Sequence, residues 1–566
     1  MEFKRVNGVV KFSKSLYVGG KEWIEYEKLG FGLYLKSTAT NRISLRVNSH
    51  SKESSIHEQN GNHNATKTWT TSNNIFTLHY TEIPEDQQKF PPLVTALQTA
   101  MEENPATFQF PGHNRGLAAP SSFSRLIGEW PFLHDVGELD DLFNPEGPIL
   151  EAQKEAAKVF GAAETWFLVG GTTCGVLAAI MATCKPGDTL ILPRNCHLSA
   201  ISALVLCGAI PKYIFPDYDS HWDATTSVSP LEVEKAIKEL ELEGKKPAAV
   251  FITSPTYHGI CSNVEDISTL CHSRDIPLIV DEAHGAHFGF HPQLPISALQ
   301  QGADVVVQST HKVLMSLTQS SMLYRRSLLV DKEKISRCLQ ILHSTSPSFL
   351  LLASLDATTA ELKQNPELVF DNAIQLARKA KAKLKQIPGI TVLDSPNTDP
   401  LRVTVGVHDL GVPGYESRDF LYKDQKVLPV LTGYRAITFL FTPGSCREHV
   451  DRLVAGFKHL SLSFFPCKTK MQEVNHATLK PFVDIDMKLT PREAFFSDKR
   501  KVDIKDTVGK ICGELICPYP PGIPVMIPGE VISEKALDIL LQAKANGAKI
   551  SGVSDPLLLS VVVCDI

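Results

Sequence analysis

The sequence predicts an α/β protein built around a mostly parallel β-sheet. Between residues 107 and 346, short apolar segments alternate with helical segments, an order typical of a parallel sheet wound by helices. The apolar segments are rich in Val, Ile, Leu and Phe, as expected of strands buried on both faces. Six strands are expected, at Trp166–Val169, Thr189–Leu192, Lys212–Phe215, Ala248–Thr253, Leu278–Asp281 and Asp304–Gln308.

Composition divides the chain of 566 residues into four parts. Residues 1–75 are rich in Ser, Thr, Asn and His and predict a disordered leader. Residues 76–346 carry the strands of the large domain, and residues 347–470 mix helices with short strands, as in a smaller α/β domain. Residues 471–566 follow a polar stretch and contain two Pro-rich segments, which are too rich in proline to form regular structure.

The leader has the charge pattern of an organelle transit peptide. Between Gly30 and Asn74 the basic residues outnumber the two acidic ones, Glu53 and Glu58, which favours a plastid address. Glu22, Glu25 and Glu27 make the N-terminus too acidic for a typical transit peptide, so a plain disordered tail on a cytoplasmic protein is the alternative.

Charge and composition limit the partners. Lys plus Arg number 57 against 62 Asp plus Glu, a net charge of −5, so the chain has no basic field for nucleic acid and a small-molecule partner is expected. The 12 cysteines are scattered, which suggests a reducing compartment. The uncharged run Thr165–Cys184 has the length of a membrane span, but glycines in its middle indicate a buried strand, a turn and a buried helix. No membrane association is expected.

Polar residues follow nearly every predicted strand. In parallel sheets wound by helices, ligands bind beyond the carboxyl ends of the strands, so these segments are the place to look for chemistry. They are Gly170–Gly175, Pro193–His197, Ser254–Gly259, Asp281–His287 and Ser309–Lys312.

The first of these segments suits a phosphate group. Thr172 and Thr173 follow two glycines where a helix begins, so hydroxyls and backbone N–H groups can face an anion with the help of the helix dipole. The alternative is a tight turn whose threonines cap the helix from Cys174 onward. No dinucleotide or nucleoside-triphosphate fingerprint is present.

Asp281 closes an apolar strand, where a carboxylate is costly unless it faces a cation or a strong donor. A pyridinium N–H would satisfy it, and a cap of the following helix is the alternative. Glu282, His284 and His287 come next and invite a metal site. The HExxH spacing is absent, so no metal is predicted.

Lys312 lies just beyond the last predicted strand, next to His311 and in a segment otherwise free of charge. A desolvated lysine has a lowered pKa and a nucleophilic amine. Taken alone, Lys312 is more simply a phosphate clamp or a lysine that extends to solvent. A phosphate turn, a His, an Asp and a Lys at successive strand ends of one sheet favour cofactor chemistry instead.

These segments resemble the fold-type I pyridoxal-phosphate enzymes, and among them the bacterial-type ornithine/lysine/arginine decarboxylase family, as an organellar, plant-like member. The resemblance covers residues from about Phe90 to the C-terminus, including the family's separate C-terminal domain. It rests on Pro111–His113 with Gly116, Gly170–Gly175, Arg194–His197, Asp281–Phe290, Gln308–Lys312 with Thr318 and Gln319, and Pro520–Pro524 with Pro528–Glu530.

The resemblance implies a role for each site residue. Lys312 would form the Schiff base with pyridoxal 5'-phosphate and Asp281 would keep the pyridine nitrogen protonated. His197 would stack on the ring, Ala283 would pack under it, and His311 would lie beside the Schiff base. Phosphate ligands would be Thr172, Thr173 and Ser309. His113 and Glu530 would border the substrate region, where a basic substrate needs acidic groups.

The implied reaction is decarboxylation of lysine, ornithine or arginine to its amine, which would feed cadaverine or polyamine synthesis. Leu198 and Asn114 stand where the family usually has lysines, and these departures touch the substrate assignment more than cofactor binding. The N-terminal wing domain of the large bacterial members has no counterpart in residues 1–75, which favours a homodimer with shared active sites. The alternatives are another fold-type I reaction, either transamination or acyl-CoA condensation, and a regulatory protein that has lost turnover.

Overall fold

The computed structural model describes residues 91–137, 139–465, 485–519, 523–545 and 547–566, and the backbone of five strands between residues 32 and 81. The chain divides into two units, Met1–Phe90 and Pro91–Ile566. All residues of the predicted site belong to the second unit.

The first unit contains strands where the sequence predicted a disordered leader over residues 1–75. β1 (Gly32–Ser37) pairs with β2 (Ile43–Asn48), and β3 (Ser55–Gly61), β4 (Asn64–Thr71) and β5 (Asn74–Thr81) form an antiparallel sheet. Threonine and aromatic residues between 64 and 81 have high strand propensity, and two-residue connections set the register. Disorder is therefore wrong for these segments. The rest of the predicted leader lies outside the described residues.

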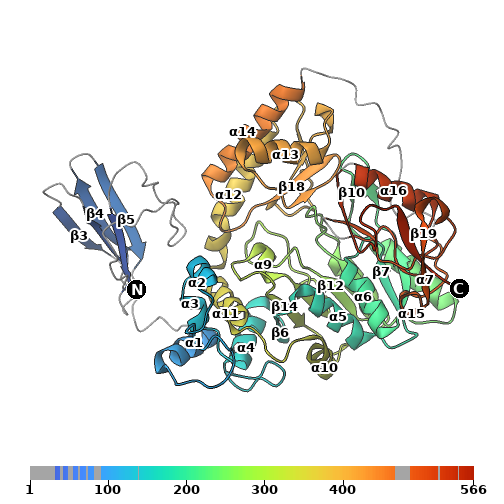
Figure 1. Ribbon diagram of the computed structural model, residues 1–566, viewed down its shortest axis with the longest axis horizontal. Coiled ribbons are helices and arrows are strands. Elements are labelled where there is room, and N and C mark those ends of the chain that lie inside the picture. Colours follow the sequence, from blue (N-terminus) through green and yellow to red (C-terminus); the bar gives the residue numbers. More distant parts are fainter. Residues whose placement is uncertain are drawn as a thin grey trace. The chain divides into compact units, whose positions relative to one another are not determined.

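The second unit is built on a seven-stranded sheet (Figure 1) in the order β6-β14-β13-β12-β11-β7-β8. All strands are parallel except β14, which is antiparallel to both neighbours. The bounds are β6 Glu164–Leu168, β7 Thr189–Pro193, β8 Ile210–Ile214, β11 Ala249–Thr253, β12 Leu278–Asp281, β13 Val305–Gln308 and β14 Ser321–Arg325. The six predicted strands are confirmed. A short antiparallel hairpin, β9 (Tyr218–Asp219) with β10 (Ala224–Thr225), follows β8.

Strand β14 was not predicted from the sequence. Its segment, Ser-Met-Leu-Tyr-Arg, is short and has polar ends, yet all five residues are buried. The polar ends are satisfied in the fold: the Ser321 hydroxyl contacts Thr172, and Arg325 Nε donates to Glu164 at 2.7 Å. The polar ends of β14 can be buried because they form hydrogen bonds with residues far away in the chain. The local sequence gives no sign of these partners.

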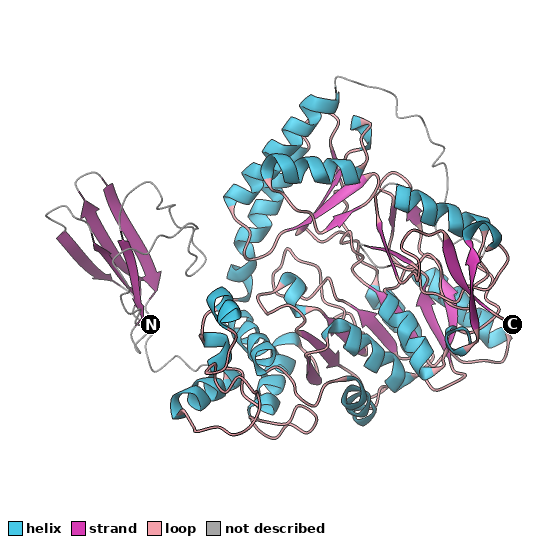
Figure 2. Cartoon of the chain, in the orientation of Figure 1, coloured by secondary structure: helices cyan, strands magenta, loops and turns pink. Residues whose placement is uncertain are grey.

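Each face of the sheet packs into its own core, with helices flanking the strands (Figure 2). On β11, Val250 and Ile252 enter one core, whereas Phe251 enters the other, as the two-residue period of a strand requires. The helices are α1 Pro92–Glu103, α2 Ser121–Ile127, α3 Trp130–Leu133, α4 Pro148–Phe160, α5 Gly171–Thr183, α6 Leu198–Cys207, α7 Pro230–Leu242, α8 Val264–His272, α9 Thr310–Val313, α10 Lys332–Leu342 and α11 Phe349–Gln364.

Helix α5 packs unusually close to the sheet because Gly175 has no side chain. A Cβ at Gly175 would lie 2.5 Å from Val307 Cγ1 and 2.7 Å from Leu168 Cδ1. This close approach lets the first turn of α5 lie next to the carboxyl end of β13. The run from Thr165 to Cys184 is thus a strand, a turn and a helix, as predicted. Within the described ranges, no helix is long and apolar enough to cross a membrane.

The smaller α/β region carries an antiparallel sheet in the order β15-β16-β18-β17. Its strands are β15 Thr391–Val392, β16 Arg402–Gly406, β17 Leu431–Thr432 and β18 Ala436–Leu440, and its helices are α12 Pro366–Leu384, α13 Gly414–Gln425 and α14 Arg447–Phe464. Strand β16 begins with Arg402, a buried arginine that reaches the large sheet.

The C-terminal region has a small core of its own. Two antiparallel pairs, β19 with β22 and β20 with β21, lie in this region; helix α16 contacts β20, and helix α15 contacts α6 of the large domain. The bounds are α15 Pro491–Phe496, β19 Lys499–Asp503, β20 Cys517–Tyr519, α16 Glu534–Ala545, β21 Lys549–Ser551 and β22 Ser560–Cys564. The Pro-rich segment was expected to be irregular, but Pro518 lies within β20, where a two-stranded pair tolerates a missing N–H.

Candidate active site

The predicted site residues come from the ends of four strands and meet around Lys312. Thr172 opens α5 after β6, His197 is the N-cap of α6 after β7, and Asp281 ends β12. Lys312 lies in α9, directly after β13. Lys312 Nζ lies 3.3 Å from His284 Nε2, and the charge of Lys312 acts on His197, His311 and Asp281.

Three hydroxyls converge at the start of α5. Thr172 Oγ1 lies 2.6 Å from Ser309 Oγ and donates to Ser321 Oγ at 3.1 Å. The N-cap residue, Gly170, provides no side-chain hydrogen bond, so no side chain caps the helix start. Thr173 is exposed beside it. The positive end of a helix, uncapped and lined with hydroxyls, is suited to bind a phosphate group. Ser321 belongs to β14 and was not predicted.

Asp281 is buried at the end of β12, with 3% of its surface exposed. Its Oδ1 accepts the Ala283 N–H at 3.0 Å. Burial raises the pKa of the carboxyl group, and the charge of Lys312 acts in the opposite direction. A buried carboxylate of this kind is stabilised by a cationic N–H donor, as the sequence predicts.

Lys312 is accessible to solvent, as a reacting amine must be, yet protein surrounds it closely. Desolvation lowers its pKa, Asp281 opposes this shift, and the positive charge of Arg402 reinforces it. The amine is 3.3 Å from His284 Nε2. A lysine with a lowered pKa has a larger uncharged, nucleophilic fraction near neutral pH.

Two histidines flank the lysine in defined tautomers. His197 Nδ1 accepts the Ser199 N–H at 3.2 Å, and burial lowers the His197 pKa to about 4, so its ring is neutral. His311 Nδ1 donates to the Ser320 carbonyl at 2.7 Å, since a carbonyl can only accept. Burial also lowers the His311 pKa. The Nε2 atom of a neutral His311 is therefore a proton acceptor beside Lys312.

The structure does not bring the two predicted substrate-region residues into this cluster. His113 Nε2 lies 3.2 Å from Asp135 Oδ2, and its Nδ1 accepts the Gly116 N–H at 3.2 Å. Glu530 binds Arg194 with both carboxylate oxygens, at 3.0 and 2.8 Å. Glu530 was expected to offer a free acidic group to the substrate. This expectation is corrected, because its carboxylate is already paired with Arg194.

The histidines that had suggested a metal take part in other contacts. His284 Nδ1 accepts from Arg402 at 2.9 Å, and His287 Nε2 lies 3.0 Å from Asp399 Oδ2. Arg402 and Asp399 were not predicted, because a charged residue beside a short apolar strand looks like an ordinary strand boundary. Only the packing of the small domain on the large one reveals them.

Glu282 lies behind Asp281 and is fully buried. Its oxygens accept from the Ala298 N–H at 2.8 Å and from Gln308 Nε2 at 2.7 Å, and burial raises its pKa to about 8. Between the ordinary pKa of glutamate and about pH 8, Glu282 is therefore protonated in the folded state and ionised in the unfolded state. Through that window, this group makes the free energy of unfolding fall as the pH rises.

We expect Glu282→Gln to increase the free energy of unfolding at pH 8 by about 1–3 kcal/mol and to flatten its pH dependence. An amide there can donate to Gln308 Oε1, which is buried without a hydrogen-bond partner. Urea unfolding from pH 5 to 9 measures this, with Glu361→Gln, at an exposed position on α11, as the matched control. A loss of stability at pH 8 would show that Glu282 is ionised in the folded protein.

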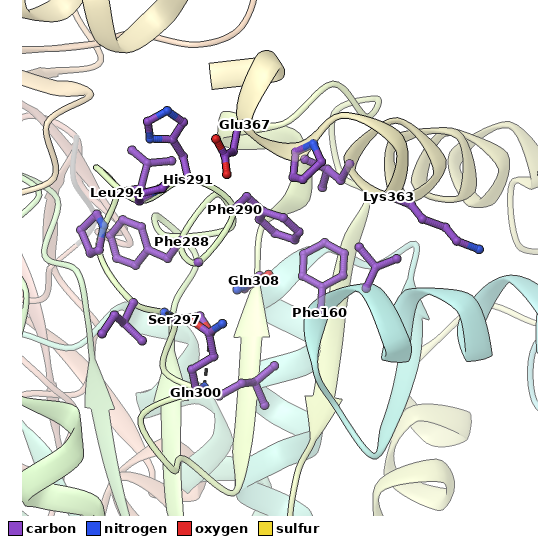
Figure 3. A pocket seen from close by; sticks show the side chains of 18 of the residues that line it. Phe160, Phe288, Phe290, His291, Leu294, Ser297, Gln300, Gln308, Lys363 and Glu367 are labelled. Atoms are coloured by element: carbon purple, nitrogen blue, oxygen red, sulfur yellow. Dashed lines mark hydrogen bonds between the residues drawn. The ribbon is translucent and has the colours of Figure 1, made fainter. Parts of the chain in front are cut away.

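A pocket of about 830 Å³ lies next to this group (Figure 3). Phe160, Phe288 and Phe290 form apolar walls, and Gln308 lies at its inner end. None of the predicted cofactor residues lines it. Gln308, which lines this pocket, donates a hydrogen bond to Glu282.

The fold matches solved decarboxylase structures. The lysine decarboxylase of Francisella novicida superposes with a TM-score of 0.73 at 23% identity, covering 84% of this chain and 81% of that chain. The constitutive lysine decarboxylase of Escherichia coli gives 0.72 at 22% identity, covering 84% of this chain and 82% of the other. Both structures share the fold of this chain, which is the fold-type I architecture that the resemblance had predicted.

Sequence comparison identifies the family. Residues 91–405 match the Orn/Lys/Arg decarboxylase major domain, and residues 472–555 match the C-terminal domain of the same family. An arginine decarboxylase of Bacillus subtilis is 34% identical over 481 residues, which are 82% of this chain and 96% of the relative. The chain belongs to the Orn/Lys/Arg decarboxylase family.

Proposed function

We propose that this chain is a pyridoxal-phosphate-dependent decarboxylase of a basic amino acid and that Lys312 is its cofactor lysine. One observation carries the proposal: a lysine with a lowered pKa lies next to the buried Asp281, at the sheet edge where α5 presents its hydroxyls. Family membership supports the same reaction class. The four predicted divisions, 1–75, 76–346, 347–470 and 471–566, stay proposals, and β5 and the first unit extend beyond the first boundary, to Thr81 and Phe90.

The residues present fit the cofactor. Thr172, Thr173 and Ser309, with the uncapped first turn of α5, would hold its phosphate. Asp281 would keep its ring nitrogen protonated, Ala283 would pack under the ring, and the neutral ring of His197 would stack on it. When bound, pyridoxal phosphate supplies an aldehyde for amine exchange and an electron sink for the bond that breaks.

The chain's own groups would control the protons. Lys312 would give up its place to the substrate amine and later return as the nucleophile that releases the product. Asp281, held by the Ala283 N–H, would provide the negative charge that keeps the ring nitrogen protonated. His311 Nε2 or the Lys312 amine would first take up a proton and would then deliver it to the α-carbon after CO₂ leaves.

Arginine is the first substrate to test among arginine, lysine and ornithine. Relatives named arginine decarboxylase are 34–35% identical to this chain, whereas those named lysine decarboxylase are 23–24% identical. Release of labelled CO₂ from each amino acid by the cofactor-loaded protein tests the proposal. We expect CO₂ from at least one of them, and an amine product that feeds polyamine or cadaverine synthesis. No release from all three would leave transamination, acyl-CoA condensation or a regulatory role.

We expect Asp281→Asn to retain the cofactor but to lower kcat by about 10²-fold or more. An amide cannot hold a pyridinium charge, although it can still accept the Ala283 N–H. Cofactor content is measured by absorbance and kcat by CO₂ release. A variant with normal kcat would show that Asp281 does not serve the ring nitrogen.

A homodimer with shared active sites is proposed from the surface near the site. The segment 108–130 and the turn after Lys312 expose large apolar side chains, which a partner copy would cover. They are Phe108, Phe110, Leu117, Phe123, Leu126, Ile127, Trp130, Met315 and Leu317. Light scattering should give twice the chain mass, and a monomeric active protein would contradict the proposal.

The plastid address of residues 1–75 is likewise proposed, from their composition alone. A fluorescent protein fused behind these residues should enter plastids in leaf cells. Cytoplasmic fluorescence would favour the alternative of a plain tail.

A further inference from the structure

A hydrogen-bonded path leads from a fixed positive charge to the Lys312 amine. Arg402 Nη2 lies 2.9 Å from His284 Nδ1, and His284 Nε2 lies 3.3 Å from Lys312 Nζ. Arg402 comes from the small domain, at the start of β16, whereas the other two residues belong to the large domain. Both Arg402 and His284 are buried, with 2% and 7% of their surfaces exposed.

The donor chemistry of arginine fixes the tautomer of this histidine. A guanidinium group can only donate, so His284 Nδ1 must be the acceptor. Burial and nearby positive charges lower the His284 pKa well below its ordinary value, which keeps the ring neutral. A neutral ring with a bare Nδ1 carries its proton on Nε2. That N–H points at the Lys312 amine.

An N–H donor facing an amine distinguishes between the two forms of lysine. The uncharged amine has a lone pair and accepts the hydrogen bond from His284 Nε2. The ammonium form has only donors, so it would place N–H against N–H. We propose that Arg402 and His284 act as a positioning relay that holds the Lys312 amine in its uncharged, nucleophilic form. The relay rests on the proposed function, because the uncharged amine of Lys312 is the form that would react with the cofactor.

The small domain holds Arg402 in position. Asp399 Oδ2 lies 3.9 Å from Arg402 Nε and 3.0 Å from His287 Nε2, and no part of Asp399 or His287 is exposed. Gly259 closes the other side, because a Cβ there would lie 2.6 Å from Arg402 Cγ. Arg402 therefore cannot leave His284 without moving the contact between the two domains.

Other charged and titratable groups also face Lys312, and they do not all favour the uncharged form. Asp281, from β12, favours the ammonium, and Arg402, from β16, opposes it. His197, from α6, and His311, from α9, are held neutral by burial. Asp281 raises the pKa of Lys312 from a neighbouring strand end, and the relay opposes this effect.

The experiment measures the protonation of Lys312 in the full-length chain after removal of the cofactor. Acetic anhydride acylates only uncharged amines, so the rate of labelling against pH gives the midpoint for each lysine by mass spectrometry. For Arg402→Met we expect the Lys312 midpoint to rise by about one pH unit, a tenfold lower rate at pH 7. Arg402→Lys keeps a cationic donor for His284 and should restore the midpoint.

His284→Asn provides a second variant that changes no buried charge. Its side-chain oxygen can still accept from Arg402, but the donor to Lys312 is lost, so the midpoint should rise here too. Exposed Lys379, on α12, is the internal reference and should not change in any variant. A change in access alone would alter the rate at high pH and leave the midpoint in place.

An unchanged Lys312 midpoint in His284→Asn would overturn the relay, as would equal shifts in Arg402→Met and Arg402→Lys. Because the labelled protein carries no cofactor and turns nothing over, the result is independent of the proposed decarboxylation. Failure of CO₂ release with shifted midpoints would refute the function and leave the relay. Normal CO₂ release with unshifted midpoints would refute only the relay.

Discussion

Replacing Lys312 by alanine is expected to lower the rate of CO₂ release by at least about 10³-fold, while leaving the fold intact. The amine is accessible to solvent and is not part of either core, so its loss removes chemistry and not packing. Single-turnover CO₂ release with saturating cofactor measures the effect.

Lys379→Ala is the matched control, because this lysine is exposed on α12 and is not among the residues around Lys312. It should retain full activity. If Lys312→Ala decarboxylated at a rate within tenfold of the unchanged protein, another amine would have to be the cofactor lysine.

Glu530→Ala is expected to lower the free energy of unfolding by about 3–5 kcal/mol, because it removes the carboxylate that pairs with the buried Arg194 guanidinium. Arg194 is 0% exposed and donates to both Glu530 oxygens and to the carbonyls of Pro524 and Val525. This clamp attaches the C-terminal region to the loop that carries His197. Urea unfolding measures the stability, and cofactor affinity should weaken with it.

The double variant Arg194→Met with Glu530→Leu provides the control for this pair. Replacing both partners by apolar side chains removes the unpaired charge, so most of the lost stability should return. A Glu530 that contacted a basic substrate, as the sequence predicted, would behave differently in Glu530→Gln: the KM would rise at unchanged stability. That result would show that Glu530 faces the substrate.

Strands buried on both faces could be predicted from the sequence, because short, continuous apolar runs bounded by turns are typical of such strands. The segment of β14 could not be, because Ser321 and Arg325 find their partners on elements more than a hundred residues away. The strands within residues 32–81 were missed for a different reason. Their polar, Thr-rich composition also fits disorder, and only pairing distinguishes the two.

The cluster around Lys312 was predictable because parallel strands deliver their carboxyl ends to one edge, so the order Thr172, His197, Asp281 and Lys312 already implied proximity. Polar contacts between domains were not predictable. Arg402 and Glu530 are each paired with a residue of the large domain more than a hundred positions away, and their charge gave no sign of the partner. Glu530, predicted to border the substrate, instead pairs with Arg194 and links the C-terminal region to the large domain. Arg402, which looked like an ordinary residue at a strand boundary, contacts His284 next to the site.

Borohydride reduction of the cofactor-loaded protein tests the central claim most directly, because it fixes a Schiff base permanently to the lysine that formed it. Peptide mapping by mass spectrometry should then find the pyridoxyl phosphate group on the peptide that contains Lys312, and on no other lysine. A cofactor fixed to a different lysine, or none fixed at all in a protein that binds pyridoxal phosphate, would contradict the assignment of Lys312.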